Sequence, residues 1–215
     1  MKTLSSLESV MAAMLLGSTS LAAASKYFKF NDESRWLTRA HATGNSASGE
    51  LSAPASGYGV DVLQWDVEVS PGQVQVLNGT VEEVYSQVLQ LNPDYALSTT
   101  AQRRSELQPR SRLVCGNYGL AHKNRILEGV RYLRTLNAAP RNGPGPANCG
   151  RVSCSYNSAI WWCNDNTTPK TLDGWDWIAN SAQTIVDSCA SGASQVSGQN
   201  YEDGNWNTIV CSDSC

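Results

Sequence analysis

The sequence contains little that points to catalysis, a metal ion or nucleic acid. It has two histidines in 215 residues, His41 and His122, and it lacks the G-x-S-x-G and H-E-x-x-H motifs of common hydrolases. No Cys-x-x-Cys pair accompanies His122, so neither a zinc site nor another cofactor is expected. Charged residues make up only 16% and the net charge is -3, which gives no basic surface for nucleic acid. We therefore expect a protein that is not an enzyme.

The sequence also lacks a run of roughly 20 apolar residues, the length that a membrane-spanning helix needs. Residues 1–24 instead have the pattern of a secretory signal peptide. Lys2 supplies a positive start, an apolar run begins at Val10, and small residues at 22–24 fit a cleavage site. No transmembrane segment is expected, and the protein is predicted to be secreted and extracellular.

Cysteine is absent from the first 114 residues, and all seven cysteines follow. Seven cysteines in about a hundred residues behind a signal peptide are typical of a disulfide scaffold. Six can form three bridges in fifteen ways, and the sequence leaves the choice open. Cys211 is the expected free thiol, because it lies in a strand only four residues before Cys215. The disulfide candidates are Cys115, Cys149, Cys154, Cys163, Cys189 and Cys215.

Residues 25–104 are interpreted as a pro-segment that precedes a cysteine-rich domain, residues 105–215. A Ser/Ala/Gly-rich stretch over 43–59 has the composition of a flexible linker. One helix is predicted near 80–92, since Thr80 and the glutamate three residues later form a capping box. One helix and a few short strands cannot form an independent core, so the segment is expected to be poorly structured.

The pair Arg103-Arg104 stands in polar, turn-prone surroundings just before the cysteine-rich domain. Exposed connections with little packing are where proteolysis concentrates. We expect a processing protease of the secretory pathway to cut here and the mature protein to begin near Ser105. The alternative is that both arginines are ordinary surface charges.

Two amphipathic helices are predicted in the cysteine-rich domain. Apolar residues recur at three and four positions over 125–136 and over 172–189. For the second helix, Thr171 is a plausible cap, and Asp173 and Asp176 are interpreted as charges that complement the first turn.

Four strands are predicted around these helices, and a short fifth strand is considered at 113–115. The segments 152–156 and 159–163 are expected to be joined by an Asn157-Ser158 turn, and 194–201 and 206–212 by a turn at Asp203-Gly204. The order of elements predicts an α+β fold, in which two helices cover one face of an antiparallel sheet. We thus expect a small disulfide-braced α/β sandwich behind a poorly structured pro-segment.

The stretch from Cys149 to Asp165, CGRVSCSYNSAIWWCND, resembles the core of a widespread family of small secreted cysteine-rich fungal proteins. The ending from Asn205 to Cys215 is similar to the same family, and the resemblance covers residues 115–215. It implies a secreted fungal protein. Because the family has no settled biochemical activity, the resemblance implies no catalytic residue.

The order of parts also resembles the KP4-type killer toxins of smut fungi. These toxins share a cysteine-bearing strand, here at Cys154, then a turn and second strand, a long helix ending at Cys189, and a last strand before Cys215. The resemblance implies an α/β sandwich that blocks growth of competing cells by interfering with calcium channels. This chain has fewer cysteines and more tryptophans, and the toxins' basic functional residue has no counterpart that can be placed here.

Tryptophans and arginines supply the candidate binding surface. In a strand, Trp161 and Trp162 face opposite ways, so at most one lies between the sheet and the helices. Trp162, and Trp177 off the apolar stripe of its helix, are therefore candidates for exposed aromatics, with Arg131 and Arg134 as basic candidates. The alternatives are that a loop or helix covers the far sheet face, and that the arginines are an ordinary solvated helix face.

Asn78 and Asn166 begin N-x-[ST] sequons, so the secreted chain is expected to be a glycoprotein. Asn78 would leave with the pro-segment, and Pro169 could make glycosylation of Asn166 inefficient.

The function predicted from these features is a secreted, non-enzymatic fungal effector or antagonist, made as a precursor. It is expected to be a monomer that binds an extracellular target, which could be a protein, a glycan or a membrane. One alternative is a KP4-like growth inhibitor that acts on a membrane channel. A second alternative is a small wall-directed hydrolase that uses His122.

Overall fold

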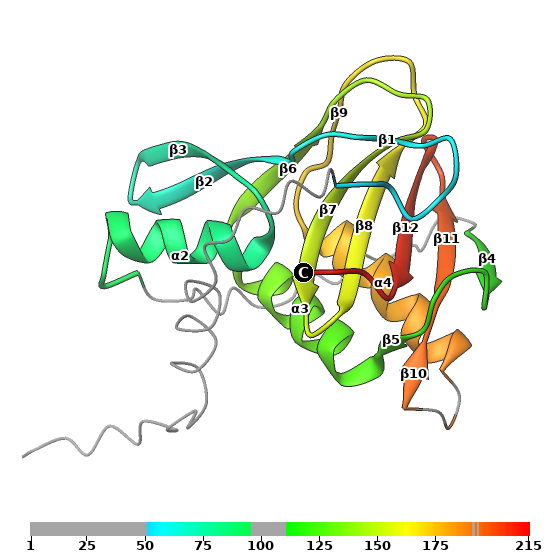
Figure 1. Ribbon diagram of the computed structural model, residues 1–215. Helices are drawn as coiled ribbons and strands as arrows, with labels where there is room; N and C mark the ends of the chain where they lie inside the picture. The colour runs from blue at the N-terminus through cyan, green and yellow to red at the C-terminus, as the bar shows by residue number, and fades with distance from the viewer. Residues whose placement is uncertain (1–50, 96–110, 191, 193) are drawn as a thin grey trace, which may run out of the picture. The chain divides into compact units, whose positions relative to one another are not determined.

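The computed structural model describes residues 51–95, 111–190, 192 and 194–215 (Figure 1). The predicted signal peptide, the pro-segment up to residue 50 and the Arg103-Arg104 pair lie outside the described residues.

A six-stranded sheet forms the centre of the described structure, in the order β1-β7-β8-β12-β11-β4. Its neighbouring strands pair in antiparallel fashion, except that β1 is parallel to β7. The strand bounds are Gly59–Val60 for β1, Arg112–Cys115 for β4, Asn148–Ser155 for β7, Ser158–Asn164 for β8, Gly198–Glu202 for β11 and Trp206–Cys211 for β12.

Two helices, α3 (Lys123–Thr135) and α4 (Asp176–Cys189), pack against one face of this sheet (Figure 1). On α3, residues four and three positions apart turn inward, so that Ile126, Val130 and Leu133 are each about 1% exposed. The predicted α+β sandwich with two helices on one face is thus confirmed.

A second, four-stranded sheet has the order β3-β2-β6-β9. Its strands are β2 (Gln64–Ser70), β3 (Gln73–Asn78), β6 (Ala138–Asn142) and β9 (Lys170–Thr171), and α2 (Val81–Leu91) follows β3. The helix predicted near 80–92 is therefore present, and Glu83 Oε2 accepts the backbone N–H of Thr80 at 2.7 Å, as in a capping box. The remaining pair, β5 (Ala121–His122) and β10 (Gln195–Val196), forms a short two-stranded sheet.

Residues 59–91 differ from the predicted poorly structured segment, because they share the core of the cysteine-rich domain. The alternating residues of β2 place Trp65, Val67 and Val69 inward, all less than 5% exposed. They belong to one hydrophobic cluster with Trp162 and the α4 residue Ile178. The segment has no core of its own, as expected, but from Gly59 onward it is not a linker. The sequence predicts a few short strands here but not their pairing, because their partners are remote in the chain.

Two predicted boundaries in the cysteine-rich domain are also wrong. The β7–β8 turn is Tyr156-Asn157 rather than Asn157-Ser158, since Ser155 pairs with Ser158. The second helix begins at Asp176 and not at Leu172, because β9 pairs with β6 and holds Thr171 in a strand. Thr171 therefore does not cap α4, whereas Asp176 does lie in its first turn.

Candidate functional site: a hollow beside the Tyr156 turn

Trp162 and Trp177, which were candidates for exposed side chains, do not form a binding surface. Trp162 is fully buried on the helix side of the sheet, and Trp177 is half-buried against the same core. The far side of the sheet carries Trp161, which is covered by a cluster that includes Ala53, Ala55 and Tyr58. The alternative of a covered far face was therefore correct, and the covering element comes from the stretch interpreted as linker.

The two arginines proposed with them do not form a common patch. Arg131 is exposed on α3, whereas Arg134 is half-buried and donates to Asn180 Oδ1 of α4 at 3.1 Å. That bond ties the two helices together, and it makes Arg134 a packing residue.

Three disulfides join the six candidate cysteines and brace the central sheet at three places. Cys115–Cys189 links β4 to the end of α4, Cys149–Cys163 crosses from β7 to β8, and Cys154–Cys215 fastens the C-terminal residue to β7. Disulfides form and persist in oxidising compartments, so these bridges indicate an oxidising environment. The described part of the chain leaves one cysteine unpaired, the buried Cys211.

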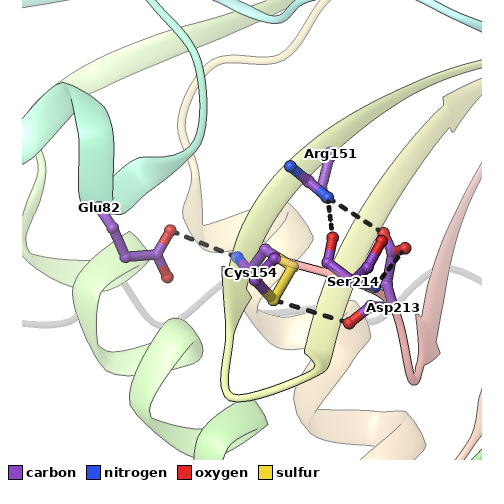
Figure 2. A network of polar contacts seen from close by, with 6 residues as sticks. Glu82, Arg151, Cys154, Asp213 and Ser214 are labelled. Carbon is purple, nitrogen blue, oxygen red and sulfur yellow. Dashed lines mark hydrogen bonds and ion pairs between the residues drawn. A yellow bond between two sulfur atoms is a disulfide. The ribbon is translucent and has the colours of Figure 1, made fainter. Parts of the chain in front are cut away.

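The C-terminal tail is also held by a polar network around Arg151 (Figure 2). Arg151 Nη1 donates to the backbone oxygen of Ser214 at 2.8 Å and forms an ion pair with Asp213 at 3.4 Å. Cys154 lies in the same view, where its backbone N–H points to a carboxylate oxygen of Glu82 at 3.4 Å. Because every partner is internal, this network acts as a clamp rather than a binding site.

A second polar network crosses the far face of the sheet and is likewise closed on itself. The hydroxyls of Tyr118 and Tyr201 both donate to Gln199 Oε1, at 2.6 and 2.8 Å. Gln199 in turn donates to Asn207, and Asn207 to Asp165. Burial, followed by the neighbouring Tyr201, raises the pKa of Tyr118 to about 12. The Tyr118 hydroxyl therefore stays protonated and serves as a structural donor.

A hollow of about 400 Å³ opens beside the β7–β8 turn and is the best candidate for a binding site in the described residues. Its lining combines an aromatic ring, an imidazole, an ion pair, an amide and a hydroxyl, contributed by His122, Asn124, Arg125, Glu128, Tyr156 and Ser194. These residues come from three separate parts of the chain, which the fold brings together.

The start of α3 positions one wall of the hollow. His122 occupies the N-cap of α3, and its backbone N–H donates to Ser158 Oγ at 2.9 Å. One turn later, Arg125 Nη1 and Glu128 Oε2 lie 2.9 Å apart as an i,i+3 ion pair. The backbone N–H of Lys123 donates to Ser194 O at 3.0 Å and holds the opposite rim against the helix.

Tyr156 forms the other wall, from a backbone conformation that is costly for its residue type. It is the first central residue of a two-residue hairpin turn, with φ of 48°, and Asn157 follows with φ of 56°. Such turns favour Asn and Gly, and a left-handed bulky residue costs about 1–3 kcal/mol. The Arg125 guanidinium lies 4.0 Å from the centroid of the Tyr156 ring, which is still 46% exposed. An exposed aromatic ring thus lies at the edge of the hollow, on a strained turn.

Sequence reasoning missed this hollow. It treated His122 as a candidate metal ligand or catalytic residue, and it assigned the turn one residue too late, so that Tyr156 was not recognised as a turn residue. The sequence did contain a signal for this turn, the run from Ser155 to Ser158 between two predicted strands. In that run a tyrosine occupies a turn position at which glycine or asparagine would have a lower conformational energy.

The two sequons differ in what surrounds their asparagines. Asn78 is exposed at the end of β3. Asn166 is half-buried, and its Nδ2 donates to Asn164 Oδ1, Gly204 O and Asn205 O, each within 3.0 Å. The nitrogen that would carry a glycan at Asn166 is therefore used to hold the β11–β12 turn.

Comparison with protein-family models, with curated proteins and with solved structures finds no match for the chain. Among the described residues, no helix is both long and apolar enough to span a membrane. The same residues contain no group of three or more His, Cys, Asp or Glu side chains able to hold a metal ion.

Proposed function

We propose that this protein is a secreted, non-enzymatic fungal effector or antagonist that binds an extracellular glycan in the hollow beside Tyr156. The observation that carries the proposal is the strained Tyr156 turn, which holds a half-exposed ring at the edge of a hollow that is also lined by polar and charged residues. Aromatic rings stack on the C–H faces of sugars, and the neighbouring amide, hydroxyl and charged pair supply donors and acceptors for sugar hydroxyls.

The size and rigidity of the hollow support this ligand class. A hollow of about 400 Å³ is within the range of small-molecule sites, which begins near 300 Å³. The Cys154–Cys215 bridge and the Arg151 clamp fix β7 just before the turn. A preformed site loses little entropy when a ligand binds, because its side chains are already ordered.

The test uses Tyr156→Gly in the full-length secreted protein. Glycine is favoured at this turn position, so the variant removes the ring while relieving the backbone strain. We expect it to remain at least as stable as the parent protein and to lose at least about tenfold in affinity for cell-wall oligosaccharides, measured by calorimetry. The matched control is Asn157→Gly, which relaxes the same turn and keeps the ring, and which should bind normally.

Tyr156→Gly and a third variant, His122→Ala, separate the competing functions, in growth-arrest and leaf-necrosis assays and in an assay of polysaccharide cleavage respectively. Activity that persists in Tyr156→Gly and is relieved by added calcium would contradict the glycan proposal and favour a channel-directed growth inhibitor. Polysaccharide cleavage that disappears in His122→Ala would contradict it in favour of a hydrolase.

A further inference from the structure

We propose that residues 51–95 are a non-covalently bound partner of the cysteine-rich domain, so that cutting the chain at Arg103-Arg104 leaves a two-chain protein. This inference is independent of the Tyr156 hollow. It differs from the expectation of a pro-segment that departs after cleavage, and it rests on the contacts that the described part of this segment makes.

Backbone pairing joins the segment to both sheets. Strand β1 is parallel to β7, and flanking it Gly59 N donates to Ala147 O at 2.8 Å and Asp61 N to Cys149 O at 2.9 Å. Strand β2 pairs with β6 over four residues, from Gln64 opposite Arg141 to Val67 opposite Ala138. If the segment left, β6 would become an edge strand next to the lost β2, and β7 would lose its pairing at Asn148 and Cys149. Proteins normally avoid unprotected strand edges.

Side chains of the segment fill spaces that the cysteine-rich domain leaves open. The rings of Trp65 and Trp175 are stacked with their centroids 3.4 Å apart. Leu63 is 1% exposed and lies directly over Gly150, where a Cβ atom would collide with its methyl groups. Because Gly150 has no side chain, it leaves the space that Leu63 of the segment fills.

The segment also covers apolar surface on both sides of the central sheet. On the helix side, Val81, Val84 and Val88 of α2 are fully buried in the cluster that contains Trp162. On the far side, Ala53 and Tyr58 pack on the cluster around Trp161. Release would expose two tryptophan-bearing surfaces at once, and burial of such surface is the main force that holds protein parts together.

A polar contact adds specificity to the same interface. The Ser153 hydroxyl donates to Glu82 Oε1 at 2.6 Å. The Cys154 backbone N–H lies 3.4 Å from Glu82 Oε2, as Figure 2 shows. Gly129 of α3 packs closely on Ser153 from the other side, so the hydroxyl is held in place. Buried hydrogen-bonded groups of this kind penalise any arrangement that leaves them unpaired.

No covalent bond can replace these contacts after a cut. All seven cysteines lie at or beyond Cys115, and the three bridges are contained within residues 115–215. A cut at Arg103-Arg104 would therefore give two chains that stay together only through the interface described above.

The experiment uses the full-length protein with a site-specific protease sequence inserted after Arg104, folded intact and then cut. We expect both fragments to elute as one species in native buffer at about micromolar concentration. They should separate in denaturant without any reductant. Separation in native buffer, with the cysteine-rich fragment still folded, would overturn the proposal.

Two variants of the cut protein test whether the identified contacts hold the chains together. Trp65→Ala should raise the dissociation constant at least about a hundredfold. Val74→Ala changes a residue of the adjacent strand that is 60% exposed, and it should leave the constant unchanged. Equal effects of the two variants would contradict the interface, and circular dichroism of the uncut variants checks that each has folded.

Discussion

The indole of Trp65 is stacked on that of Trp175, with ring centroids 3.4 Å apart and planes inclined by 21°. Trp65 belongs to β2, and Trp175 is the N-cap residue of α4, more than a hundred positions later. Both indoles are at most 1% exposed. This pair joins the part of the chain without cysteines to the part that holds all of them, and it gives the first of four predictions.

Truncation of Trp65 should destabilise the intact protein strongly. Trp65→Ala removes a fully buried indole and leaves a cavity against Trp175, so the free energy of unfolding should fall by about 3–5 kcal/mol. Val74→Ala, at an exposed position on β3, should change it by no more than about 0.5 kcal/mol. Urea titrations followed by tryptophan fluorescence measure both values. A similar decrease in the free energy of unfolding for both variants would mean that the stack of Trp65 on Trp175 does not stabilise the fold.

Stability should decrease with rising pH because of Glu82. Burial raises the pKa of Glu82 above its ordinary value of 4.5, although hydrogen bonds, chiefly from the Ser153 hydroxyl, act in the opposite sense. Below pH 4.5 the carboxyl group is protonated in both the folded and the unfolded chain, so its contribution is fully present. As the pH rises through the raised pKa, folding must bury a carboxylate, and the contribution is lost.

The measurement for Glu82 is the free energy of unfolding as a function of pH in the parent protein and in two variants. Glu82→Gln should flatten the decrease, because the amide cannot ionise. Asp173→Asn removes an exposed carboxylate at a position outside the helices and serves as the control for the loss of one charge. A pH profile that is the same in Glu82→Gln as in the parent protein would refute this assignment.

The thiol of Cys211 should be inert in the folded protein. Burial, with a smaller contribution from the nearby Asp213 carboxylate, raises the pKa of Cys211 to about 12. Since the thiolate is the reactive form, alkylation at pH 8 should be slower than that of a free cysteine by roughly a thousandfold or more. Mass spectrometry should find no label on the native chain and one label after unfolding without reductant. Rapid labelling of the native protein would show that Cys211 is accessible.

Glycosylation should occur at Asn78 and not at Asn166. Asn78 is exposed, whereas Nδ2 of Asn166 donates to three oxygen atoms around the β11–β12 turn, so a glycan there would displace contacts of the fold. The mobility shift on enzymatic deglycosylation of the protein, expressed through the secretory pathway of a fungal host, should disappear in Asn78→Gln. The Asn166→Gln chain should keep the shift. A shift lost with Asn166 instead would contradict the prediction.

The local sequence pattern was sufficient to predict the elements that depend only on residues close together in the chain. The spacing of Ile126, Val130 and Leu133 indicated α3, and the Thr80 capping box marked the start of α2. Cysteine position and count indicated a braced domain and singled out Cys211 as the spare thiol. These predictions succeed because helical periodicity and capping depend on side chains within a few positions of each other.

Only the tertiary structure decided which segments pack against each predicted helix and strand. Strand alternation says that Trp161 and Trp162 face opposite ways, but only the packing of α3 and α4 determines which side is covered by helices and which by residues 53–60. The bridge pattern, the hollow around Tyr156 and the inclusion of residues 59–91 in the core all join segments that are remote in the chain. Their energies come from contacts between distant residues, and no local pattern of the sequence records them.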